Sequence, residues 1–364
     1  MSPRAVITGI GLVSTLGCGV RETLAAIATG RKARGPVSAF DARGFCQSHG
    51  AEIRDFNARE YFRLTKALKL ADRTTQFAVA AAALALRDAD WRHTGPSDRL
   101  GVAIGCSGSD MRVPDIGRAL SGTSFDDVDD APVFADRMLT RLNPLWLLTT
   151  LPNMSSAHVA IQLEARGPNT TVMSDWAAGL QAIGEACEWI RAGEADAVLA
   201  GGADTGVTPL AYAAFEQGGL FAGPAPFVPG EGAAIFLIEN ADSAVARGAQ
   251  VLGEVVGYQS AAVPADDPAR LSDGMAGVLL GACTEAAWDP GERSRSVRCA
   301  SFEPWLGHAL AAAAPIDLAL SLRSGTAVAN RAGKLCFAAG PSGQMAALAV
   351  GPENHRRSGD THAA

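Results

Sequence analysis

Residues 167–184, GPNTTVMSDWAAGLQAIG, predict a strand that turns sharply into a helix. A Gly-Pro turn leads into the β-rich run TTVMS, and an alanine-rich helix follows the corner. Backbone N–H groups and the helix dipole at such a helix N-terminus favour negative charge. In thiol enzymes, a cysteine at this position has a lowered pKa and acts as a nucleophile. Here the corner is Asp175-Trp176-Ala177, which contains no thiol.

On both sides of this segment, short apolar runs alternate with alanine-rich helical stretches, a pattern typical of an α/β protein. Residues 233–239, AAIFLIE, are continuously apolar, as expected for a strand buried on both faces. The acidic, polar segment 121–130 predicts a surface loop, and its flanks at 110–120 and 133–142 predict short helices. We expect longer helices over 66–88, 177–192 and 309–324, and strands over 4–10, 100–106, 170–174, 196–202, 233–239, 251–258, 297–301, 335–339 and 345–350.

The pattern changes near Arg247-Gly248-Ala249, after which a new strand is predicted to begin. We therefore expect a first half over 1–249 and a shorter second half over 250–352. The last residues, 353–364, are polar and predict a flexible tail.

The composition favours a globular protein with a large core, because 48% of the 364 residues are hydrophobic and only 19% are charged. The net charge is −7 and no Lys/Arg stripe is present, so we expect no nucleic-acid partner. The apolar run 5–13 is too short to span a membrane and lacks a cleavage signal. Seven scattered cysteines without a CxxC pair suggest reduced thiols, and we expect a cytoplasmic protein without a metal site.

The segment 167–184 resembles the active-site segment of β-ketoacyl synthases, in which Ala-Cys-Ser/Thr-Ser-Gly precedes an amphipathic helix. With the Gly-Pro turn and Gly179 aligned without a gap, the family's nucleophilic cysteine falls on Trp176. The resemblance implies an α/β protein with the thiolase fold, layered α/β/α/β/α, with two pseudo-related halves. Four further stretches resemble the family: AVITGIGLVSTLGCG (5–19), LNPLWLLTTLPNMSSAHVAIQLEARGPN (142–169), AGEADAVLAGGAD (192–204) and PFVPGEGAAIFLIENADSAVARGA (226–249).

The chain departs from the family where the family performs condensation. A ketosynthase needs a thiolate that carries the acyl chain, and two histidines that decarboxylate malonyl and hold the enolate. One of these histidines aligns with His308, but Glu303 replaces the family's lysine and the connection 285–298 lacks the loop with the second histidine. The family's glycine-rich loop is reduced to residues 337–343, which include a proline. We therefore expect no catalytic residue: Trp176 plugs a vestigial site, and His308 is vestigial.

Among ketosynthase-like proteins, the chain most resembles the chain length factor of type II polyketide synthases, in the polyene-forming, highly reducing type or in aryl-polyene clusters. Such a subunit pairs with an active ketosynthase, and the shared interface forms the tunnel in which the chain grows. The resemblance implies this heterodimer, an acyl carrier protein as a second partner, and no cofactor beyond the carrier protein's phosphopantetheine, bound by the complex. Most such subunits carry Gln at the cysteine position, and Trp176 departs from them.

The same alignment predicts where the growing chain meets this subunit. Strand 170–174 is expected to pair with its counterpart across the two-fold axis, as in other thiolase-fold dimers. The gate of the tunnel falls on the helix after strand 100–106, although its apolar positions also fit the core side of any amphipathic helix. The gate residues are Met111, Val113, Ile116 and Leu120.

Two alternatives stay open. An active acyltransferase or decarboxylase would use Ser174 as a nucleophile and His308 as its base. A pure scaffold would stabilise the ketosynthase without any influence on product length.

Overall fold

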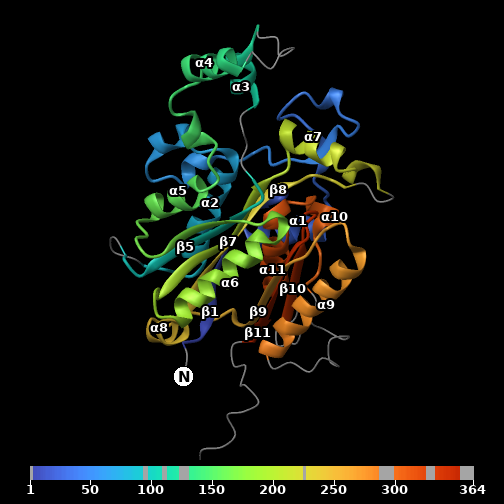
Figure 1. Cartoon of the computed structure of the whole chain (residues 1–364). Coiled ribbons are helices and arrows are strands. Elements are labelled where there is room, and N and C mark those ends of the chain that lie inside the picture. The colour runs from blue at the N-terminus through green and yellow to red at the C-terminus, as the bar shows by residue number, and fades with distance from the viewer. Residues whose placement is uncertain are drawn as a thin grey trace, which may run out of the picture.

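The computed structural model describes residues 3–92, 97–108, 113–122, 131–223, 227–286, 299–324 and 333–352. Their helices and strands form alternating layers of helix, sheet, helix, sheet and helix (Figure 1). This is the layered α/β/α/β/α arrangement that the resemblance implied. None of the described helices combines the length and the hydropathy that a membrane span requires.

One sheet runs through the molecule in the order β10-β11-β9-β1-β8-β7-β5-β6. Only two residue pairs, Val6 with Glu254 and Ile7 with Gly253, join β1 to β9. We call the strands from β1 to β6 in this order the first sheet segment, and β9, β11 and β10 the second sheet segment. The strands are β1 (Ala5–Ser14), β2 (Gly17–Cys18), β5 (Leu100–Cys106), β6 (Asn169–Met173), β7 (Ala197–Thr205), β8 (Glu231–Asn240), β9 (Gly253–Ala262), β10 (Lys334–Ala339) and β11 (Gln344–Gly351), beside a separate hairpin of β3 (Arg34–Pro36) and β4 (His49–Ala51).

Helices cover both sheet segments (Figure 1). Helices α2 and α5 pack on the outer face of the first segment, and α9 packs on the outer face of the second. Helices α6 and α11 lie between the two segments and contact both of them. The helices are α1 (Val20–Ala28), α2 (Arg73–Asp88), α3 (Val113–Leu120), α4 (Ala131–Arg141), α5 (Met154–Leu163), α6 (Ala178–Arg191), α7 (Pro209–Gln217), α8 (Ala241–Ala246), α9 (Pro268–Glu285), α10 (Glu303–Leu306) and α11 (Ala313–Arg323).

The two segments repeat one plan. Each begins with a strand and an outer helix (β1 and α2, β9 and α9), and each ends with an inner helix and an antiparallel strand pair (α6, β7 and β8; α11, β10 and β11). The repeat extends to a glycine in the first strand, where the outer helix comes close. A Cβ atom on Gly11 would lie 1.8 Å from the carbonyl oxygen of Ala81, and one on Gly257 would lie 2.1 Å from that of Ala282. The segments differ at their ends, because the first continues past β7 with β5 and β6, whereas the second ends at β10 within the described residues.

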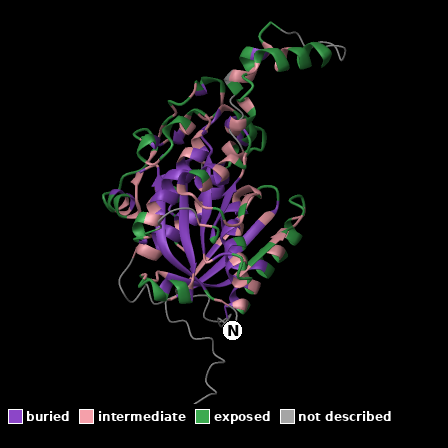
Figure 2. Ribbon diagram, turned by 90° about the vertical axis from the view of Figure 1, so that its left-hand side faces the viewer, coloured by how far each residue is buried: buried purple, intermediate pink, exposed green. Residues whose placement is uncertain are grey.

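The burial of the central strands follows from the layered arrangement of helices and sheet. Strands β1, β5 and β7 are buried along their whole length because helices cover both of their faces (Figure 2). The side of α6 and α11 that faces each sheet segment is rich in alanine and other small or apolar residues, which lets the layers pack closely. The hydrophobic core of the first half therefore extends into the middle layer of α6 and α11, which lies next to the corner with Trp176.

The helix predicted over 66–88 is interrupted. A short 3₁₀ helix, η3 (Thr65–Lys69), precedes α2, which begins at Arg73. The side chain of Asp72 caps α2, because it accepts a hydrogen bond of 2.8 Å from the backbone N–H of Thr75. The boundary is thus set by a capping residue inside a stretch whose apolar spacing looked continuous.

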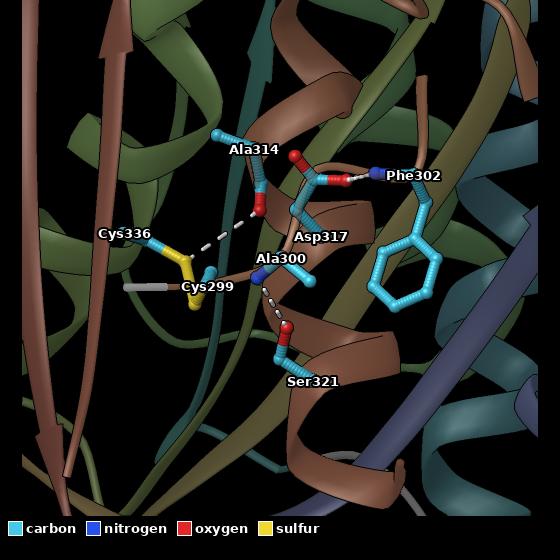
Figure 3. The surroundings of a disulfide bond; sticks show 7 residues. All are labelled: Cys299, Ala300, Phe302, Ala314, Asp317, Ser321 and Cys336. Atoms are coloured by element: carbon cyan, nitrogen blue, oxygen red, sulfur yellow. Dashed lines mark hydrogen bonds between the residues drawn. A yellow bond between two sulfur atoms is a disulfide. The ribbon is translucent and has the colours of Figure 1, made fainter. Parts of the chain in front are cut away.

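The strand predicted over 297–301 is wrong for the described residues 299–301, which form no strand. The backbone N–H of Cys299 donates to the carbonyl of Leu335 in β10 at 3.0 Å, but no ladder follows. Cys299 also forms a disulfide with Cys336 (Figure 3), which corrects the expectation of reduced thiols. Because these cysteines are 37 residues apart in the sequence, no spacing motif indicated the pair.

The segment after Cys299 is held by side chains of α11 (Figure 3). The backbone N–H of Ala300 donates to the hydroxyl of Ser321 at 3.2 Å, and that of Phe302 donates to the carboxylate of Asp317 at 2.8 Å. These contacts hold the chain beside β10 in the place of a paired strand.

Several expectations stay predictions. The domain boundary near residue 249 has no test here. The tail 353–364, Met111 and most of the connection 285–298 lie outside the described residues.

Candidate functional site

The corner at the centre of the sequence analysis joins β6 to α6 through a short 3₁₀ turn, η6 (Asp175–Ala177). Asp175 has a φ of 53°, a left-handed conformation that Asp adopts more readily than most residues. Its carboxylate accepts hydrogen bonds from the backbone N–H and the hydroxyl of Ser342, at 3.0 and 2.9 Å. The hydroxyl of Ser174 donates to the side-chain oxygen of Gln344 at 3.2 Å. The corner is therefore fastened to the loop between β10 and β11.

Trp176 follows Asp175 and lies half-buried among aromatic rings. Its indole stacks on Phe227, with ring centroids 5.8 Å apart and an interplanar angle of 6°. The ring of His308 lies 4.2 Å from the indole and is tilted by 49°. The structure thus brings together Trp176 and His308, the two residues that the alignment assigned to the vestigial site. Trp176 lies in the turn that directly precedes α6, and its role as a plug of a vestigial site stays a prediction.

The protonation of His308 follows from its surroundings. Its Nδ1 accepts a hydrogen bond of 3.1 Å from the backbone N–H of Leu310, so the proton of the neutral ring is on Nε2. Burial lowers the pKa of His308 to about 4, and the imidazole is neutral at pH 7. Among the described residues, no hydrogen bond joins His308 to Ser174, the pair that the alternative enzyme hypothesis requires.

Two cavities lie on opposite sides of Trp176. The larger has a volume of about 750 Å³ and extends into the second half between α9, α11 and β10, and we call it the β10 cavity. The smaller has a volume of about 320 Å³ and lies between the ends of β5 and β7 and helix α7. Trp176 and Leu310 line both cavities and form the wall between them. Leu310 has a φ of 52°, which is uncommon for a large side chain and marks a strained position at this wall.

Asp204 is a buried carboxylate at the smaller cavity that sequence reasoning did not identify. It accepts hydrogen bonds from the backbone N–H groups of Ser107 at 2.7 Å, Thr205 at 3.0 Å and Ala311 at 3.2 Å. Burial raises the pKa of Asp204 to about 6, although these donors favour the charged form. Asp204 thereby joins the ends of β5 and β7 to the turn that follows His308. In the sequence, the only indication that Asp204 belongs to the site was its position at the end of the apolar run AVLAGGAD.

Two further carboxyl groups, Glu303 and Asp317, line the β10 cavity. Burial raises the pKa of Glu303, and it raises the pKa of Asp317 to about 7 against the hydrogen bond from the N–H of Phe302. The alignment had marked Glu303 as a charge reversal, whereas Asp317 lies in a helical stretch that nothing in the sequence distinguished.

The thiols of Cys106 and Cys187 are not activated. Cys106 ends β5 and Cys187 lies in α6, and both are buried. Burial raises the pKa of Cys106, and it raises that of Cys187 to about 12, so both are protonated at pH 7. Within the described part of the chain, no group of three His, Cys, Asp or Glu side chains could hold a metal ion.

The predicted gate residues lie apart from both cavities. Val113, Ile116 and Leu120 belong to α3, which packs against α4 in a pair of helices that projects from the body (Figure 1). Val113 is 38% exposed, and the other two are half-buried. They line neither of the two cavities at Trp176, and their role stays a prediction.

Comparison with known proteins places this geometry in a family. Residues 3–244 match the profile of the family described as "Beta-ketoacyl synthase, N-terminal domain". The chain belongs to the β-ketoacyl synthase family. It is 32% identical over 271 residues to 3-oxoacyl-[acyl-carrier-protein] synthase 2 of Synechocystis, an alignment that covers 70% of this chain and 62% of that protein. It is 29% identical over 304 residues to the synthase 2 of Staphylococcus aureus, covering 79% of this chain and 70% of that one.

Solved structures show the same ketosynthase fold. "The ishigamide ketosynthase/chain length factor" superposes with a TM-score of 0.78 and 24% identity, covering 97% of this chain and 100% of that chain. A chain of the complex described as "type II PKS acyl-carrier protein in complex with its ketosynthase bound to the hexaketide" gives a TM-score of 0.74 and 22% identity, with the same coverage. A β-ketoacyl synthase from Burkholderia phymatum gives 0.76 and 21%, covering 96% of this chain and 99% of that one.

Proposed function

We propose that this β-ketoacyl synthase family member is a non-catalytic subunit that pairs with an active ketosynthase and helps to set the length of a polyketide or polyene chain. The observation that carries the proposal is Trp176 at the N-terminus of α6. An indole has no accessible nucleophilic lone pair and cannot carry an acyl group. The other described histidines, His49 and His158, lie away from the corner: His158 packs beside Phe62, and His49 lies in the β3–β4 hairpin.

The edge of the sheet supports a partner. Strand β6 is the last strand of the first sheet segment and, among the described strands, pairs only with β5. Its sequence NTTVM contains no charge and no proline, the features with which proteins usually protect an exposed edge. Such an edge is suited to pairing with a strand of a second subunit.

Exposed apolar side chains on β6 and on the segments that precede it in the sequence also favour an interface. Met173 at the end of β6 is 55% exposed, and Ile161 on α5 is 50% exposed. Exposed apolar residues that gather in one part of a protein often mark a binding surface. Between α4 and β6, the large apolar residues with exposed side chains are Val133, Phe134, Leu139, Leu145, Leu147, Leu151, Ile161 and Met173.

The interface is tested by co-expression with an active ketosynthase of a type II polyketide synthase. Met173→Asp places a charge at the end of the open edge, and we expect it to abolish co-purification of the two subunits. Val245→Asp is the matched control, because Val245 is 71% exposed on α8, a helix that contacts β1 and β8. Equal recovery of the ketosynthase with both variants would refute pairing through this edge.

Control of chain length is tested in the purified complex. We expect Ile116→Phe to shorten the products and Ile116→Ala to lengthen them, as measured by mass spectrometry, because the side chain would narrow or widen the predicted gate. Product lengths that stay unchanged, with the complex intact, would favour a pure scaffold.

Absence of catalysis is tested on this chain by itself. The protein is incubated with labelled acyl or malonyl carrier protein, and we expect neither acylation of the chain nor release of CO₂. Either event would support the alternative enzyme with Ser174 and His308, and Ser174→Ala would then have to abolish it.

A further inference from the structure

The β10 cavity lies at the open edge of the second sheet segment and reaches both faces of β10. Leu335, Phe337 and Ala339 belong to the cluster on the α9 side of the strand. Cys336 and Ala338 belong to the cluster on the α11 side. Since all five residues line the cavity, it surrounds the edge of the strand.

The first sheet segment has a strand at the position where the second has the β10 cavity. There β7, the counterpart of β10, pairs with β5 through six residue pairs, from Leu100 with Ala197 to Gly105 with Gly202. In the described residues, β10 has no such neighbour, and only Cys299 approaches its edge, through one hydrogen bond and the disulfide. Among the described residues no strand covers this edge, and the cavity lies where β5 lies in the first segment.

The unpaired edge presents backbone hydrogen-bonding groups to the cavity. In an antiparallel pair, successive residues direct their N–H and C=O groups alternately toward the partner and away from it. The carbonyl of Leu335 accepts from Cys299, on the side away from β11, whereas the N–H of Gly340 donates to Gln344 on the β11 side. By this alternation, the N–H and C=O groups of Phe337 point to the open edge. No hydrogen bond to them is found among the described residues.

The walls of the cavity determine what it could bind. Apolar side chains from α9, α11 and β10 dominate them, among which are Met275, Leu279 and Ile316. The carboxyl groups of Glu303 and Asp317 lie on the same walls and would repel an anion. A volume of about 750 Å³ is in the range of pockets for drug-sized ligands.

We propose that the β10 cavity binds an elongated, uncharged, apolar molecule with an amide group, whose N–H and C=O pair with the backbone of Phe337. The amide thereby replaces one residue of the missing strand, and the apolar part fills the space between α9 and α11. The raised pKa values of Glu303 and Asp317 fit a compartment shielded from water. This inference goes beyond the proposed function, because it uses only residues of this chain and holds whether or not the chain pairs with a ketosynthase.

Binding is measured with N-phenyl-1-naphthylamine, an uncharged apolar fluorophore with an N–H group, added to the purified full chain. We expect saturable binding with a blue-shifted emission. N-methyldodecanamide should displace the fluorophore about tenfold more effectively than methyl dodecanoate, which lacks the donor. Dodecanoate should displace it least. Equal displacement by the amide and by dodecanoate would overturn the proposed ligand class.

A variant pair locates the binding. Ala276 lines the cavity from an exposed position on α9, so Ala276→Trp fills the entrance without disturbing the core. Leu280 is 45% exposed on the same helix and does not line the cavity, which makes Leu280→Trp the matched control. We expect Ala276→Trp to weaken binding about tenfold or more and Leu280→Trp to leave it unchanged. Absence of saturable binding in the unaltered chain, equal binding by both variants, or equal loss in both would each overturn the proposal.

Discussion

In the first sheet segment β7 lies between β8 and β5, whereas its counterpart β10 lies between β11 and a cavity. The two segments also differ in charge. Strand β8 carries two buried carboxylates, Glu231 and Glu239, each paired with an arginine, but β11 has the sequence QMAALAVG and no charged residue. The first segment is thus completed by strands and ion pairs, and the second by a disulfide and by contacts with α11. The comparison teaches that the described second segment, with fewer strands, still packs on α6 and α11, the layer next to the corner with Trp176.

The largest effect is expected from Glu231→Ala in the first segment. The Glu231 side chain is fully buried and binds Arg73 at 2.5 Å, the hydroxyl of Thr205 and the backbone N–H of Ile53. Its removal leaves a partly buried arginine unpaired, which should lower the free energy of unfolding by about 4 kcal/mol in urea titrations. Asp41→Ala breaks a solvent-exposed pair with Arg43 and should leave the midpoint unchanged. Equal losses of stability in the two variants would show that the buried ion pair of the first segment contributes no more than an exposed pair.

The second segment should depend on its disulfide. Cys299→Ser should lower the free energy of unfolding by about 3 kcal/mol, because the cross-link closes a long loop in the unfolded chain. Differential scanning calorimetry with and without a reductant checks this, and reduction should bring the unaltered chain down to the stability of the variant. Cys46→Ser, at an exposed cysteine outside any disulfide, is the control. If reduction leaves the stability of the unaltered chain unchanged, the disulfide does not stabilise the edge of the second segment as a paired strand would.

The paired glycines compare the two outer layers directly. Gly11→Ala forces a Cβ against α2 in a fully packed layer, and we expect a loss of about 3 kcal/mol. Gly257→Ala makes the same contact with α9, but α9 borders the cavity and can shift, so the expected loss is about 1 kcal/mol. Chemical denaturation of both variants provides the test. Equal losses would mean that α9 is held as firmly as α2.

The smallest effect concerns Asp317, whose pKa is raised from 3.8 to about 7. The folded chain binds more protons than the unfolded chain between these values, so this group lowers stability as the pH rises from about 4 to 7. Asp317→Asn keeps an oxygen for the N–H of Phe302 and removes the titration. We expect it to raise the free energy of unfolding by about 1 to 2 kcal/mol at pH 8 and to have no effect below about pH 4. A gain that is the same at all pH values would contradict this assignment.

The elements of the first half follow closely from the sequence. Residues 100–106 were predicted as a strand and form β5 with the same bounds, and 233–239 lies inside β8. Both are continuous apolar runs in a layered protein, where burial on two faces leaves little alternative. The corner with Trp176 was also located, because a β-rich run before an alanine-rich helix has a distinct pattern.

Residues of the second half that depend on partners distant in sequence could not be predicted. The run 297–301 has the composition of a strand, but its described residues lie beside β10 without a ladder. The disulfide and the buried carboxyl groups of Asp204 and Asp317 had no local signature, since burial comes from elements brought together only by folding. Only the family alignment indicated that Trp176 and His308 belong to one site, and their ring contact was not predicted.

The fastening of the corner to the last hairpin has a consequence for synthesis of the chain. Asp175 finds its hydrogen-bond partner in Ser342, 167 residues later, and Ser174 finds its partner in Gln344, the first residue of the last strand. On the ribosome, where N-terminal parts emerge first, the corner must wait without these hydrogen bonds until residues 342–344 have been translated. The residues that surround Trp176 therefore reach their final arrangement only after the hairpin of β10 and β11 has emerged.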